Sequence, residues 1–165
     1  MAKSPRVRRF HYAMLQTAHS GMAWQKQYAA IESGLADYFS CSFLGTPKFA
    51  EISAKVFNPN AGYLRLLAND KKFTEFASIQ DVQMPYQGAE IWGGLFWAIR
   101  DRTSRDVADP VFVAAWHAMQ WPAEEARRAP AFVDALRAAA RSRMTQTHFD
   151  AVEEILRARE FPITR

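Results

Sequence analysis

The side chains that could do chemistry gather near the N-terminus of the chain. His11 and His19 are eight positions apart, so on one helix they lie within about 80° of each other and could contact one ligand. Glu32 and Asp37 follow on the next predicted helix. Imidazole and carboxylate groups bind zinc in hydrolases, and a tyrosine such as Tyr86 can donate to an oxyanion. Zinc-dependent hydrolysis is therefore one interpretation, and ordinary surface or core side chains are the other.

Apolar residues recur at helical spacing along most of the chain, which predicts the elements that would position these side chains. Helices are expected at about residues 7–19, 25–44, 89–102, 105–120, 130–143 and 145–159. No run of strands is visible, so the prediction is an all-α fold, a compact multi-helix bundle. Residues 10–165 are expected to form a single helical domain behind a basic N-terminal arm at residues 1–9.

Two of these helices are expected to dominate the core. The predicted apolar stripe of helix 25–44 consists of Tyr28, Ile31, Leu35, Tyr38, Phe39 and Phe43. Helix 89–102 is apolar on almost every side, which predicts that it is the central buried helix. Gly93 and Gly94 each lower its helix propensity by about 1 kcal/mol relative to alanine. That cost predicts that another backbone packs closely at this point.

The composition is that of a globular chain with enough apolar residues for a core. The chain has 165 residues, of which 49% are hydrophobic, and this length favours one domain. The longest apolar run, residues 91–99, is too short to cross a bilayer, so no membrane span is predicted. No secretory signal is visible, and the single cysteine, Cys41, is expected in the core. A cytoplasmic location is therefore favoured.

Positive charge is concentrated at the N-terminus. Residues 1–31 contain no Asp or Glu, whereas all 17 acidic residues lie in residues 32–165. The basic residues of the N-terminal arm are Lys3, Arg6, Arg8 and Arg9. Such an arm can bind an anion such as phosphate or nucleic acid, an anionic membrane or an acidic protein surface, and the alternative is a solvated tail. The aromatic and polar rows expected of a nucleic-acid groove are not evident, so nucleic acid is not the favoured partner.

Two blocks of sequence point to a known family. Residues 32–39 read ESGLADYF and are followed by a GTP turn at 45–47. Residues 67–73 read LANDKKF and lead to GAEIWGGLFWAIR at 88–100. These blocks resemble the C-terminal helical lobe of the gluzincin metallopeptidases, the thermolysin-like and fungalysin-like group. The resemblance covers roughly residues 10–160 and implies a helical lobe that carries a zinc site.

The zinc-ligand helix departs from the family pattern. The resemblance places a ligand glutamate four positions before Asp37, where this chain has Ser33. Glu32 is adjacent but points about 100° away around the helix, so without a metal it is expected to be a solvated or hydrogen-bonded acid. Asp37 stands where the family has a partner of a ligand histidine. We expect it to be buried and to accept a hydrogen bond from a tyrosine or a backbone amide.

The other zinc-site positions are altered as well. The family's H-E-x-x-H helix should lie upstream in one of two registers. One begins at His11 and puts Tyr12 at the position of the general base, and the other ends at His19 and puts Gln16 there. Neither register keeps both histidines or the acid. Tyr86 occupies the position of the family's oxyanion histidine.

The altered positions predict a catalytically inactive, peptidase-like helical domain that binds a protein partner or forms a homo-oligomer, with no cofactor. The family's β-rich lobe has no counterpart here, so the surface that would meet it is the expected binding face. One alternative is a zinc-dependent peptidase or metal-binding protein with a divergent site at His11, His19, Glu32 and Tyr86. The second alternative is anion or nucleic-acid binding through the basic N-terminal arm.

Overall fold

The computed structural model describes residues 26–78 and 88–164 of the chain. The helices in these residues are α2 (Lys26–Leu44), α3 (Glu51–Phe57), α4 (Ala89–Arg102), α5 (Arg105–Ala118), α6 (Arg128–Arg143) and α7 (Gln146–Ala158), with the short 3-10 helices η1 (Phe73–Ser78) and η3 (Glu125–Arg127). Two short antiparallel strands, β1 (Lys48–Phe49) and β2 (Arg65–Leu66), accompany them. The predicted all-α, mostly helical fold is confirmed, with this two-stranded sheet as an addition that the sequence did not reveal.

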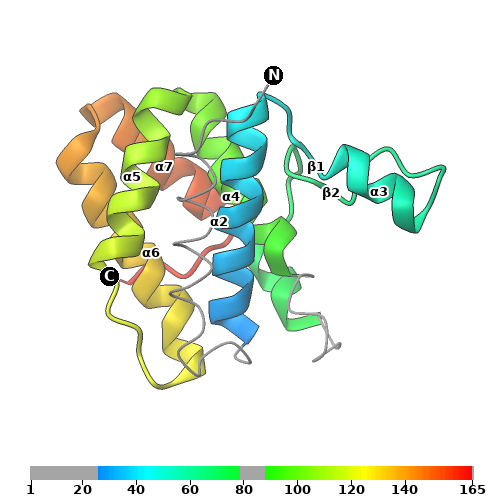
Figure 1. The fold of residues 1–165 in the computed structure, drawn as a ribbon. Coiled ribbons are helices and arrows are strands. Elements are labelled where there is room, and N and C mark those ends of the chain that lie inside the picture. The colour runs from blue at the N-terminus through cyan, green and yellow to red at the C-terminus, as the bar shows by residue number, and fades with distance from the viewer. Residues whose placement is uncertain (1–25, 79–87, 165) are drawn as a thin grey trace.

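Helix α4 lies at the centre of the helical body, as predicted (Figure 1). Nine of its residues are buried, and α2, α5 and α7 pack against it. Its apolar residues occupy almost the whole circumference, because neighbours cover it on several sides. Helices α5 and α6 pack closely on each other and complete the core. Ser104 and Thr145 accept hydrogen bonds from the backbone amides three residues on, which begins α5 and α7.

Glycines let α2 and α4 approach each other closely. A β-carbon on Gly34 of α2 would lie 2.6 Å from the β-carbon of Trp92 and 2.9 Å from the backbone nitrogen of Gly93. At Gly93 it would lie 3.5 Å from the carbonyl oxygen of Gly34. The predicted close backbone approach is therefore confirmed at Gly93. At Gly94 the neighbour is instead a side chain, the amide of Asn69, 2.5 Å away.

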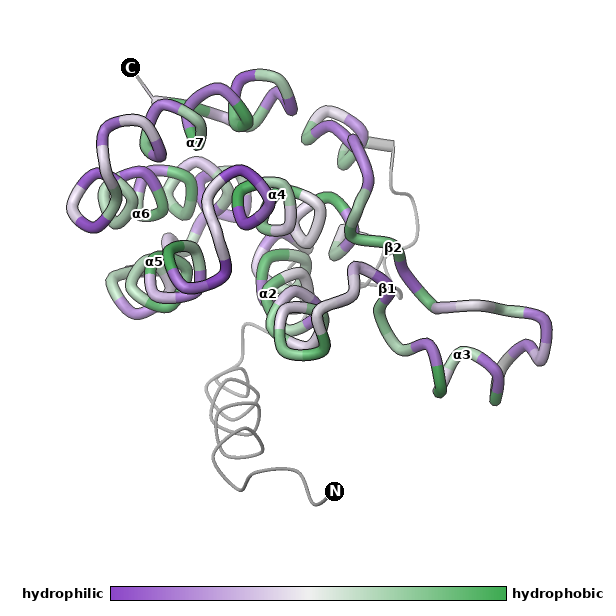
Figure 2. The backbone as a smooth tube through the Cα atoms, turned by 90° about the horizontal axis from the view of Figure 1, so that it is seen from above, coloured by the Kyte–Doolittle hydropathy of each residue, from purple (hydrophilic) through white to green (hydrophobic). Residues whose placement is uncertain are grey.

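Residues 48–66, which we call the α3 projection, extend away from the helical body (Figures 1 and 2). Strands β1 and β2 form its base and α3 its outer part. Ala50, which precedes α3, has φ 59° in the left-handed region that an alanine adopts at a cost. Phe43, at the end of α2, is 43% exposed. Its predicted place in the core stripe is wrong because the last turn of α2 leads out to the projection.

None of the helices in the described ranges is both long enough and apolar enough to cross a bilayer. Cys41 is buried in α2, as predicted, and burial raises the pKa of its thiol to about 12. A thiol of this kind stays protonated at neutral pH and behaves as a small core residue.

Candidate functional site

The predicted site residues divide into two groups. Glu32, Ser33 and Asp37 lie on α2 and are described by the structure. The positions outside the described residues are Lys3, Arg6, Arg8, Arg9, His11, Tyr12, Gln16, His19 and Tyr86. The roles predicted for this second group, in zinc binding, oxyanion stabilisation or anion binding, therefore remain predictions.

Asp37 is buried, as predicted, and accepts two hydrogen bonds from the guanidinium group of Arg65 on β2. Arg65 Nε lies 2.5 Å from Oδ2, and Nη2 lies 2.9 Å from Oδ1. Asp37 therefore bonds another donor, as expected, and this donor is a guanidinium, whereas the sequence suggested a tyrosine or a backbone amide. The same guanidinium lies 4.6 Å from the ring centroid of Phe49. The pair ties the base of the α3 projection to α2 by a bidentate, charge-assisted contact.

Glu32 lies half-buried on the same helix, and its Oε1 atom is buried without a hydrogen-bond partner among residues 26–78 and 88–164. Within these residues, the expectation of a solvated or hydrogen-bonded acid does not hold for this oxygen. Burial raises the pKa of Glu32 from its ordinary 4.5 to about 7. Burial, and secondly the charge of Glu32, raises the pKa of Tyr28, one turn earlier, to about 12. Burial thus favours the neutral, protonated form of the Glu32 carboxyl at pH values above its ordinary pKa.

The described part of α2 does not supply a zinc site by itself. The residues of 26–78 and 88–164 contain no cluster of three His, Cys, Asp or Glu side chains that could hold a metal ion. Ser33 offers a hydroxyl where zinc proteins use Cys, His, Asp or Glu. The guanidinium beside Asp37 adds positive charge that would repel a divalent cation. A zinc site would therefore depend on His11 and His19, outside the described residues.

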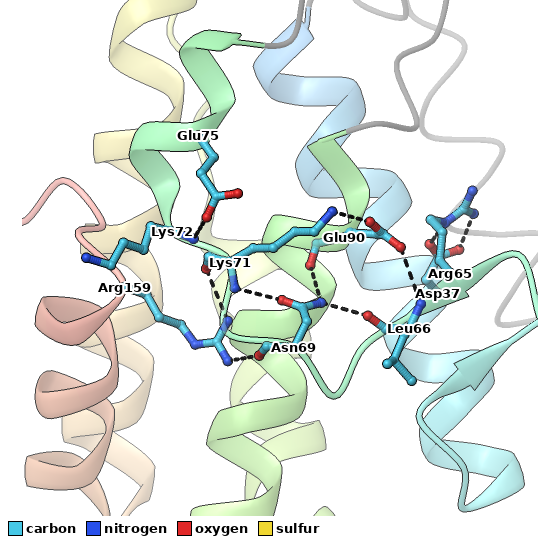
Figure 3. Close-up of polar contacts among 9 residues, drawn as sticks. All are labelled: Asp37, Arg65, Leu66, Asn69, Lys71, Lys72, Glu75, Glu90 and Arg159. Atoms are coloured by element: carbon cyan, nitrogen blue, oxygen red, sulfur yellow. Dashed lines mark hydrogen bonds and ion pairs between the residues drawn. The ribbon is translucent and has the colours of Figure 1, made fainter.

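A polar network fixes the loop after β2 against the first turn of α4 (Figure 3). Glu90, in the first turn of α4, accepts a hydrogen bond from the Leu66 amide at 3.3 Å and pairs with the Lys71 ammonium group. The Asn69 side-chain amide donates to the Leu66 carbonyl at 2.7 Å and to the Glu90 carbonyl at 3.1 Å. Its Oδ1 accepts from the Lys71 amide at 3.1 Å. Asn69 therefore pairs with the Leu66 carbonyl and the Lys71 amide and ties both to the Glu90 carbonyl in the first turn of α4.

The C-terminal end of α7 holds the same loop from the other side (Figure 3). Arg159 donates to the Lys71 carbonyl at 3.2 Å and to the Asn69 carbonyl. Burial lowers the pKa of Arg159. Glu160 pairs with Lys72 Nζ at 2.5 Å and accepts from the Thr74 hydroxyl at 2.7 Å. Residues far apart in the sequence thus hold this loop in place against α4.

Beside this network is an open pocket of about 330 Å³. The residues that line it are Leu67, Ala68, Asn69, Asp70, Trp97, Ala98, Asp101 and Arg159. The lining contains no His, Cys, Ser or Thr, so it offers no hydroxyl or thiol nucleophile and no imidazole base, and its acidic groups are Asp70 and Asp101. One ring of Trp97 is already covered by the Arg100 guanidinium at 4.3 Å from its centroid. The volume is at the lower end for a small-molecule site.

Sequence reasoning missed Arg65, Asn69 and Glu90, although a buried Asp37 indicated a strong donor of unknown identity, which the structure shows to be Arg65, 28 positions along the chain. Gly94 interrupts an apolar helix, which indicated that a neighbour packs where a β-carbon would otherwise lie. That neighbour is the Asn69 side chain.

Comparisons of the chain with protein-family models, curated proteins and solved structures find no match. The gluzincin resemblance therefore continues to depend on the two sequence blocks alone.

Proposed function

We propose that the chain is a catalytically inactive, peptidase-like helical domain that acts by binding another protein through the α3 projection. The observation that carries this proposal is the exposure of Ile52 and Val56 on α3, at 86% and 81%. The two side chains are one helical turn apart, so they lie on one side of α3. The projection itself extends away from the helical body (Figure 2).

Further apolar side chains extend this exposed surface. The large hydrophobic residues exposed in the described chain are Phe43, Leu44, Ile52, Val56, Tyr63 and Leu64. All six lie in the projection or within a few residues of β1, whereas the other helices keep their large apolar side chains inside. Scattered apolar residues are normal on a protein surface, but residues concentrated on one segment indicate a protein-binding site.

The inactive part of the proposal is supported by the chemistry of α2. Ser33 stands where the resemblance requires a ligand carboxylate, and a hydroxyl binds zinc poorly. Asp37 accepts two bonds from Arg65 and so holds a cation beside the position where the family would orient a histidine. Both features oppose the binding of a divalent metal.

Two measurements test the proposal. Elemental analysis after purification in zinc-containing buffer is expected to find far less than one zinc per chain, with no zinc-dependent hydrolysis of peptides. Proteins retained by the immobilised wild-type chain are then compared with those retained by an Ile52→Ser/Val56→Ser variant. A specific partner is expected to be retained by the wild type and lost by the variant. One zinc per chain together with peptidase activity would contradict the inactive part of the proposal. An identical set of retained proteins, together with a chain that does not associate with itself, would contradict the binding part.

A further inference from the structure

The outer surface of α3 has a pattern of charge that is complementary to itself. At 100° per residue, Ile52 and Val56 form a stripe and Lys55 lies on one flank of it, with Glu51 one turn from Lys55 on that same flank. All four side chains are exposed, whereas Ala54 is buried within the projection. The ion pairs found among the described residues use neither Glu51 nor Lys55. Both charges are thus available to a partner.

We infer that the partner of the α3 projection is a second copy of this chain, bound by antiparallel pairing of the two α3 helices. This inference rests on the proposed binding role of the projection. In a pair related by a two-fold axis, each flank of the helix meets the same flank of the other copy in reverse order. Glu51 then lies opposite Lys55 of the second copy, and Lys55 opposite Glu51 of the second copy. The two apolar stripes meet between these ion pairs.

A parallel arrangement does not give this match. It would place the flank with Glu51 and Lys55 against the opposite flank, which carries the uncharged Ser53. The charges would then lack partners, and the two-fold antiparallel arrangement is the one that the pattern favours. Opposite charges at fixed register set the orientation of a pair more than they set its affinity.

The size of the contact limits its strength. A helix of seven residues is about 10 Å long, so α3 alone buries less than the roughly 1,200 Å² of a standard interface. Leu64 and Tyr63, exposed on the same projection, can add apolar area. We therefore expect a weak dimer with a dissociation constant of roughly 10 μM or higher, in which each exposed ion pair changes the affinity by a few-fold.

Sedimentation equilibrium of the full chain tests the pairing over a concentration range up to about 1 mM. The wild type is expected to shift from monomer to dimer with concentration, and Ile52→Ser/Val56→Ser to stay monomeric. Glu51→Lys and Lys55→Glu are each expected to weaken self-association, because like charges then face each other. An equimolar mixture of these two variants is expected to associate, and the double variant Glu51→Lys/Lys55→Glu to dimerise like the wild type.

The charge variants keep the test decisive if the serine variant folds poorly, because exposed charge exchanges leave the core untouched. Circular dichroism melting checks that each variant is folded. A wild type that stays monomeric at every concentration would overturn the self-pairing. The proposed binding of another protein would then still be tested by the retention experiment. The self-pairing would also be overturned if the folded serine variant still dimerised, or if Glu51→Lys and Lys55→Glu dimerised as strongly as the wild type.

Discussion

Glu32 gives the most quantitative prediction from the structure. Burial raises the pKa of its carboxyl to about 7, and its Oε1 atom has no hydrogen-bond partner in the part of the chain that the structure describes. In the unfolded chain the same group titrates near its ordinary 4.5. Between these two values the folded state binds more protons than the unfolded state. The free energy of unfolding therefore falls as the pH rises through this window. The ionised Glu32 carboxylate destabilises the fold to its full extent above the folded-state pKa.

The size of the effect follows from the shift. One pKa unit corresponds to about 1.36 kcal/mol, so the ionised Glu32 destabilises the fold by roughly 3 kcal/mol at most. Partial exposure to solvent reduces this to about 1–2 kcal/mol. Glu32→Gln keeps the shape of the side chain and removes the charge. We expect the variant to be more stable than the wild type by about 1–2 kcal/mol at pH 8, with the difference disappearing near pH 4.5.

Urea unfolding followed by tryptophan fluorescence, in steps from pH 4.5 to pH 8, measures both proteins in the same way. The control is Glu154→Gln, since Glu154 is 65% exposed on α7 and pairs with Arg102 at the surface. Its stability is expected to change by less than about 0.5 kcal/mol at any pH in this range. A Glu32→Gln variant no more stable than the wild type at pH 8 would refute the reasoning. It would mean that a cation or a donor stabilises the carboxylate.

Three other substitutions test the packing and the projection, each by the same unfolding measurement. Gly34→Ala is expected to cost about 3 kcal/mol, because its new methyl group would overlap α4, whereas Gly62→Ala, with open space around it, should cost less than about 1 kcal/mol. Arg65→Ala is expected to cost about 3 kcal/mol, since it removes two bonds from the buried Asp37 carboxylate, and adding Asp37→Asn should recover part of this loss. Ala50→Gly is expected to stabilise the chain by up to about 1 kcal/mol, because glycine adopts the left-handed conformation without the steric cost. An unchanged free energy of unfolding in Gly34→Ala would contradict the close packing of α2 on α4, and in Arg65→Ala it would contradict the ion pair with Asp37. A lower free energy of unfolding in Ala50→Gly would contradict the strained backbone at Ala50.

Local sequence determined the helices. The helix predicted at 89–102 coincides with α4, and the one predicted at 25–44 agrees with α2 over all of its described residues, Lys26–Leu44. These elements are readable because apolar spacing, helix propensity and stop signals act within a few turns of the chain. For the same reason, the close approach at Gly93 could be predicted from the unusual cost of glycine inside an apolar helix.

Only the tertiary structure decided the contacts of the site. Asp37 meets Arg65 across 28 positions of sequence, and Arg159 reaches the Asn69 carbonyl across 90. Phe43 has the spacing of a core residue, yet it is exposed because α2 ends beside the projection. Whether Glu32 is solvated or buried depends on which segments cover α2 and not on its neighbours along the helix. Such properties depend on contacts between distant segments, for which helical periodicity carries no signal.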